Sequence, residues 1–172
     1  LYELTSGSGN IGIGFQALLG HTTGAKNIAI GYGSMNGTAQ DDAPTSTDNV
    51  FIGYDAGGGA WDDGADSTDD SNKNVGIGNY VMDAAMDGAQ FNTGVGYEAL
   101  SSITTGSANV GIGREAGKII STGGTNTCVG NASGQTLTTG GSNVCVGYGA
   151  DTDTSGRAGC VIIGYGVSLN TA

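Results

Sequence analysis

The stretch NTGVGYEALSSITTGSA, residues 92–108, decides the fold of this chain of 172 residues. Its first five residues recur as a unit: Asn, an apolar residue or Thr, a variable residue that is mostly small, Ile or Val, and Gly, here called the first to fifth places. The fifth-place Gly stands at positions 14, 31, 53, 78, 96, 113, 130, 147 and 164, in steps of 17, 22, 25, 18, 17, 17, 17 and 17. A 17-residue period is too short for a strand–helix–strand crossover, which needs about 30 residues. The sequence therefore predicts an all-β parallel β-solenoid, or β-roll, of about nine 17-residue coils and about 40 Å in length.

Composition narrows the functional classes. The chain has 35 Gly but one Pro, which excludes collagen and argues against long helices. Its net charge of −11 would repel a phosphate backbone, so we expect no nucleic-acid partner. The sequence contains no long apolar run, and we expect no membrane insertion. We predict one domain over residues 1–172, with no enzymatic activity and no cofactor.

Three insertions lengthen the period, at about 36–48, 58–73 and 83–91, and we expect all three to fall at the same corner of successive coils. Insertions of this kind often build the binding face of a repeat array. Trp61 could stack on a sugar or could instead anchor its own loop. The acidic run around it could ligate calcium, but we expect a solvated loop and no metal. The candidate receptor-binding residues are Trp61, Asp62, Asp63, Asp66, Asp69 and Asp70.

Both faces of the five-residue strand are apolar. We expect the second and fourth places to fill the coil interior and the third place to point outward, because alternate side chains share a face. Nine copies carry no polar residue at the third place, which favours a stripe buried against other copies of the chain, most economically in a parallel homotrimer. The predicted subunit interface consists of Gly12, Ala29, Phe51, Gly76, Gly94, Gly111, Cys128, Cys145 and Ile162.

The first place is Asn in eight of the nine copies, and Cys160 replaces it in the ninth. Stacked Asn side chains can hydrogen-bond along a solenoid and to turn backbone, so we assign this column a structural role. Cys128 and Cys145 are interpreted as apolar fillers of the subunit interface, with interchain disulfides as the alternative. The column consists of Asn10, Asn27, Asn49, Asn74, Asn92, Asn109, Asn126 and Asn143.

The repeat in residues 92–108 resembles the 17-residue repeats of phage tail fibres and the head repeats of trimeric autotransporter adhesins. The resemblance covers essentially the whole chain. It implies a non-catalytic parallel homotrimer of β-rolls in a tail or capsid fibre of a virion. Such a fibre would bind a host cell-surface glycan or protein, and would assemble with other fibre or virion proteins. Because the chain starts and stops in mid-repeat, we expect it to be a fragment of a longer fibre. There are two alternatives. The first is the head of a bacterial trimeric autotransporter adhesin on the extracellular bacterial surface, and the second is an ice-binding β-solenoid that uses the Thr-Thr turns.

Overall fold

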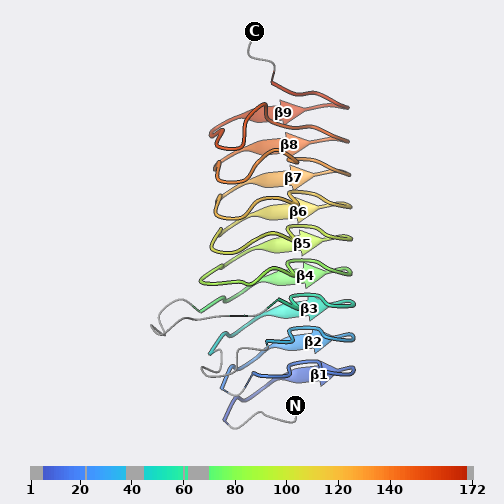
Figure 1. Ribbon diagram of the computed structural model, residues 1–172, viewed down its shortest axis with the longest axis vertical. Coiled ribbons are helices and arrows are strands. Elements are labelled where there is room, and N and C mark those ends of the chain that lie inside the picture. Colours follow the sequence, from blue (N-terminus) through green and yellow to red (C-terminus); the bar gives the residue numbers. More distant parts are fainter. Residues whose placement is uncertain (1–5, 22, 38–44, 60, 62–69, 170–172) are drawn as a thin grey trace.

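Nine three-residue strands form one parallel sheet in a computed structural model that describes residues 6–21, 23–37, 45–59, 61 and 70–169. Each strand pairs in register with the strand of the next coil, so the strands stack in chain order along a rod (Figure 1). The predicted all-β parallel β-solenoid is confirmed. The strands are β1 (Ile11–Ile13), β2 (Ile28–Ile30), β3 (Val50–Ile52), β4 (Val75–Ile77), β5 (Thr93–Val95), β6 (Val110–Ile112), β7 (Thr127–Val129), β8 (Val144–Val146) and β9 (Val161–Ile163).

Each strand ends at its fifth-place glycine because the chain turns there in a conformation that other residues rarely adopt. Gly96 has φ +135° and Gly113 has φ +130°. A Cβ on Gly96 would lie 2.5 Å from the carbonyl oxygen of Gly113 in the next coil. The glycine column therefore permits both the sharp turn and the close spacing of successive coils, about 4.8 Å in a parallel sheet.

The strands point their third-place side chains into the coil, whereas the sequence pattern predicted the second and fourth places there. Third-place side chains are buried inside the coil of their own chain, as Ala29, Phe51 and Cys145 show with no exposed surface. The second and fourth places lie on the outer face and are half-buried or exposed in every strand. The third-place stripe is therefore not the subunit interface. This correction applies to Gly12, Ala29, Phe51, Gly76, Gly94, Gly111, Cys128, Cys145 and Ile162.

The volume of the coil interior explains this orientation. Phe51 is paired in register with Gly76, and a Cβ on Gly76 would lie 2.5 Å from the Phe51 ring. In a later coil, a Cβ on Gly111 would lie 2.8 Å from Leu100, which is also fully buried. Third-place glycines thus leave room inside a narrow coil for the side chains of neighbouring residues, rather than for a second chain.

The first-place asparagines form a continuous hydrogen-bonded ladder along the inside of one corner. The backbone N–H of Asn109 donates to Oδ1 of Asn92 (2.9 Å), and the Asn109 amide group donates to the same oxygen (3.1 Å). The Asn109 Nδ2 also donates to the carbonyl of Gly123 in the return turn (2.8 Å). At the ninth copy the backbone N–H of Cys160 still donates to Asn143 Oδ1 (3.0 Å). The ladder therefore fastens each coil to the next, and the start of each strand to the return turn that follows it in the same coil.

Candidate functional site

The outer face of the sheet is an apolar surface that runs the length of the rod. It consists of the second and fourth places of all nine strands, and we call it the outer strand face. Sixteen of its eighteen residues are Ile or Val; the other two are Thr93 and Thr127. Ile13, Ile77 and Ile163 are 58%, 41% and 66% exposed. A continuous apolar surface of this extent is typical of an interaction site on a soluble protein.

Trp61 anchors the second insertion instead of projecting from it. Its side chain is 1% exposed, and its indole Nε1 donates a hydrogen bond to the carbonyl of Gly57 (2.7 Å). The ring lies edge to face against Phe51 (centroids 5.6 Å apart, 82° between planes) and against His21 (5.4 Å, 75°). Of the two roles that the sequence left open for Trp61, the structure supports the anchor, and the sugar-stacking role is wrong.

His21 is the buried companion of Trp61. Its side chain is 1% exposed, and within the described parts of the chain neither ring nitrogen has a hydrogen-bond partner. Burial lowers the pKa of His21 from 6.5 to about 4 because the imidazolium would lose its hydration. The neutral ring therefore packs as an aromatic residue at neutral pH.

Acid should weaken this packing. Since the pKa is about 4 in the folded chain and 6.5 in the unfolded chain, His21 destabilises the fold progressively as pH falls from 6.5 to 4, by up to about 3 kcal/mol. We expect a His21→Leu variant to lose less stability than the wild type over this range. Denaturant titrations followed by the fluorescence of Trp61, the only tryptophan, measure the difference.

Carboxylates titrating in the same range are common to both proteins and cancel in that comparison. One of them, Asp83, affects stability in the opposite direction to His21. Burial raises the pKa of Asp83 to about 6, so Asp83 lowers the free energy of unfolding as pH rises from about 4 to 6. Parallel pH profiles for wild type and His21→Leu would contradict the role of His21.

The acidic residues of the second insertion fall mainly outside the described part of the chain. The predicted positions Asp62, Asp63, Asp66 and Asp69 lie there. Asp70 is described: it is half-buried, and the hydroxyl of Thr45, from the first insertion, donates a hydrogen bond to it. The two insertions are thus joined at one corner, as the spacing predicted. Among the described residues no group of His, Cys, Asp or Glu is arranged to hold a metal ion.

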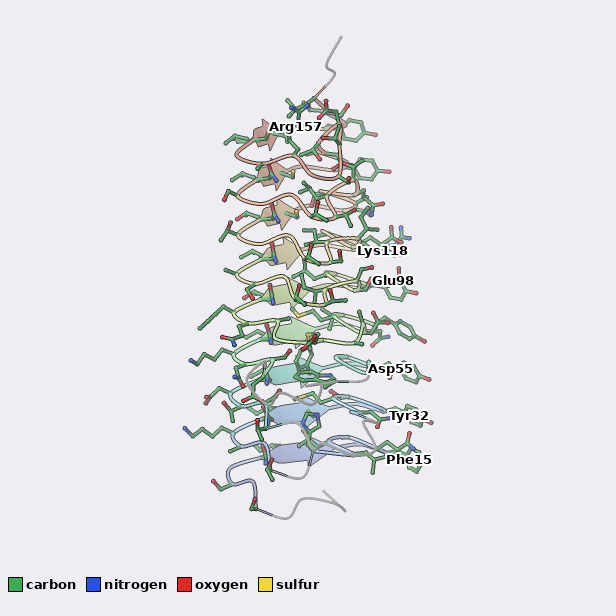
Figure 2. All side chains as sticks on the ribbon, turned by 60° about the vertical axis from the view of Figure 1, so that its left-hand side comes forward. Phe15, Tyr32, Asp55, Glu98, Lys118 and Arg157 are labelled. Carbon is green, nitrogen blue, oxygen red and sulfur yellow. The ribbon has the colours of Figure 1, made fainter. Side chains whose placement is uncertain are left out.

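A second set of side chains gathers where the chain turns after each strand. Figure 2 shows Phe15, Tyr32, Asp55, Glu98 and Lys118 projecting from one edge of the rod. The aromatic rings of this edge contact one another in successive coils from Phe15 to Tyr97, and again between Tyr148 and Tyr165. We call the set of Phe15, Tyr32, Tyr54, Tyr80, Tyr97, Tyr148 and Tyr165 the aromatic column.

Charged residues continue this edge between Tyr97 and Tyr148. Lys118 forms ion pairs with Glu98 and with Glu115 (3.8 Å), and Arg114 pairs with Glu115 (2.8 Å). Hydrogen bonding to Lys118 lowers the pKa of Glu98. The charges of this cluster are balanced locally, and its pairs are exposed enough that each contributes little to stability.

Cys128 and Cys145 lie in the coil interior, whereas Cys160 is half-buried. Cys128 and Cys145 are fully buried and paired in register on β7 and β8, and the described structure holds all three cysteines as free thiols. A hydrogen bond with Cys145, together with burial, raises the pKa of the Cys128 thiol. They are fillers of the coil core, so the assignment to a subunit interface is wrong, and interchain disulfides through these two positions are excluded by their burial.

Comparisons with protein families, with curated proteins and with solved structures found no match to this chain. In the part of the chain that the structure describes, no helix is long and apolar enough to cross a lipid bilayer.

Proposed function

We propose that this chain is a segment of a trimeric phage tail or capsid fibre, which acts as a rigid, non-catalytic shaft and presents host-binding loops. The observation that carries this proposal is the outer strand face. Its Ile and Val side chains lie on every coil, and no part of the described chain folds back over its most exposed residues, Ile13, Val161 and Ile163. Exposed apolar area of this kind favours association.

The period of the outer strand face favours other copies of the same chain as the occupants. Its β-branched residues form ridges that repeat once per coil, about every 4.8 Å. A parallel copy has the same repeat, so its ridges fit between these ridges over the whole rod. Three copies around one axis close the arrangement and leave the insertion corner and the aromatic column available on each chain.

Disrupting this face should dissociate the trimer. We expect Ile112→Asp, combined with Ile77→Asp, to convert a species of three chain masses into a monomer, because charges would be buried at the interface. Ile119→Asp is a matched control, since Ile119 is similarly exposed (37%) but lies outside the strands.

Light scattering gives the mass, and circular dichroism verifies that the solenoid remains folded. A monomeric wild-type chain would contradict the trimer, and so would a double variant that stays trimeric.

The inserted corner is the proposed host-binding region. Its first two insertions are joined by the Thr45–Asp70 hydrogen bond, and Trp61 fixes the beginning of the second insertion on the coil core. Three copies on one shaft would present three weak sites at once, which raises overall avidity without new contacts. The ligand class is a host cell-surface glycan or protein.

Replacing the acidic part of the second insertion should abolish adsorption of the fibre to host cells. We expect replacement of residues 62–69 by a Gly-Ser linker to remove binding of the fibre to host cells, while Trp61 still anchors the loop and the trimer mass is unchanged. The same replacement of residues 38–44 measures how much the first insertion adds to binding. Full adsorption by the 62–69 variant would overturn the assignment of these residues.

The head of a bacterial trimeric adhesin would use the same outer strand face and the same corner. Detection of the protein in purified virions supports the fibre, and its presence on a bacterial surface supports the adhesin head.

A further inference from the structure

The aromatic column contains two kinds of ring pair. Tyr32 and Tyr54 are nearly parallel, with centroids 5.2 Å apart and 6° between planes, and Tyr148 and Tyr165 match them at 5.1 Å and 14°. The other two tyrosine pairs are edge to face: Tyr54 with Tyr80 at 65°, and Tyr80 with Tyr97 at 81°. The centroid distances of the four pairs differ by less than 1 Å, so orientation is what separates them.

Neighbouring coils hold the parallel pairs in place. The Asp55 backbone N–H donates to the carbonyl of Tyr32 (2.8 Å), and the Gly166 N–H donates to the carbonyl of Tyr148 (2.8 Å). Each pair is therefore fixed at the backbone, while the rings themselves remain open to reagents: Tyr32 and Tyr54 are 48% and 44% exposed, and Tyr165 is 82% exposed.

We propose that Tyr32–Tyr54 and Tyr148–Tyr165 are sites of oxidative coupling, at which dityrosine bonds link successive coils of one chain. Parallel rings turn their faces toward each other, which is the approach by which two phenoxyl radicals couple at their ortho carbons, and side-chain rotation closes the remaining distance. In an edge-to-face pair the edge of one ring meets the face of the other, so the ortho carbons do not oppose each other. Proximity fixed by the fold replaces a collision between two radicals with an intramolecular step.

The chemistry balances with a peroxide as oxidant. Each phenol loses one electron and one proton, and the two phenoxyl radicals form a carbon–carbon bond between their ortho carbons. The hydrogens on those carbons then move to the oxygens, which restores two phenols. Two tyrosines and one hydrogen peroxide thus give one dityrosine and two waters, with a haem peroxidase carrying the electrons.

The consequence is a covalent link between coils that otherwise share only backbone hydrogen bonds and packing. The Tyr32–Tyr54 bond would span the turn that carries the first insertion, and the Tyr148–Tyr165 bond would join the coils of β8 and β9. A fibre modified in this way resists local opening of these coils, because the bonds limit the freedom of the opened chain.

The test treats the folded chain with a peroxidase and hydrogen peroxide at low protein concentration and maps cross-linked peptides by mass spectrometry. We expect intrachain Tyr32–Tyr54 and Tyr148–Tyr165 products, each short of two hydrogens, at several times the yield of either edge-to-face pair. A Tyr32→Phe, Tyr165→Phe double variant should lose most of the dityrosine fluorescence. A Tyr80→Phe, Tyr97→Phe double variant is the matched control and should retain it.

Unfolding the chain in denaturant before oxidation should remove the preference for the parallel pairs. Equal yields from all four pairs in the folded chain, or products found only between chains, would overturn the proposal. The cross-links are measured within one chain. Failure of the dityrosine proposal would therefore leave the proposed trimer and host binding unaffected.

Discussion

Replacing Asn109 by alanine is expected to lower the free energy of unfolding by about 4 kcal/mol, because buried hydrogen bonds are lost on both sides of its coil. Asn109 Oδ1 accepts from the backbone N–H and the side-chain Nδ2 of Asn126, both at 3.0 Å. Asn109 Nδ2 donates to the carbonyl of Gly123 at 2.8 Å. Alanine leaves these partners buried without water to replace the lost bonds.

Urea denaturation followed by circular dichroism measures this effect. The matched control is Asn131→Ala, because Asn131 is a half-buried asparagine in the turn after β7 and lies outside the ladder. We expect the control to change stability by less than about 0.5 kcal/mol. A loss at Asn109 no larger than the loss at Asn131 would show that the ladder contributes little beyond what water supplies in the unfolded chain.

Gly113→Ala is expected to destabilise the fold by about 3 kcal/mol or more, through backbone strain and a steric clash. Gly113 has φ +130°, a conformation that side chains rarely allow, and its Cβ would lie 2.6 Å from the carbonyl oxygen of Gly130. That oxygen belongs to the backbone of the next coil, which is held in register by the pairing of β6 with β7. The clash therefore cannot be relieved by a side-chain rotation.

The control for this prediction is Gly156→Ala. A Cβ at Gly156 would have Thr139 Oγ1 at 3.6 Å as its nearest neighbour, which is ordinary contact distance. Thermal unfolding of the two variants should place Gly113→Ala far below the wild type and Gly156→Ala close to it. Similar midpoints for Gly113→Ala and the wild type would mean that the turn relaxes to accept a side chain.

A large part of the architecture follows from the repeat. The 17-residue period predicts one strand per coil, the parallel sheet and the corner shared by the insertions. The first-place Asn and fifth-place Gly recur because each coil places them against the same atoms of the next. The receptor-binding assignment of the acidic insertion and the trimer remain predictions, since the contacts that would test them are made with other molecules.

The prediction that the second and fourth places fill the coil interior was wrong, because both faces of each strand are apolar and alternation alone does not say which face points inward. Two signals in the sequence favour the observed answer. Thr93 and Thr127 occupy the second place, where a polar group is tolerated because it lies on the outer face. Phe51 is followed in the next copy by Gly76 at the same place, which is the large–small alternation of a packed interior.

The position of Trp61 shows the same limit at a single residue. Nothing in its neighbourhood of Gly and Asp distinguishes an exposed ring from a buried one. The burial of its ring depends on Phe51 and His21, which lie ten and forty residues earlier in the chain. A local repeat can specify where the backbone turns and which residues recur at each turn. The side chains that fill the narrow coil are decided by the interior volume available. Side chains from neighbouring coils fill that interior together, and those coils come into contact only when the chain folds.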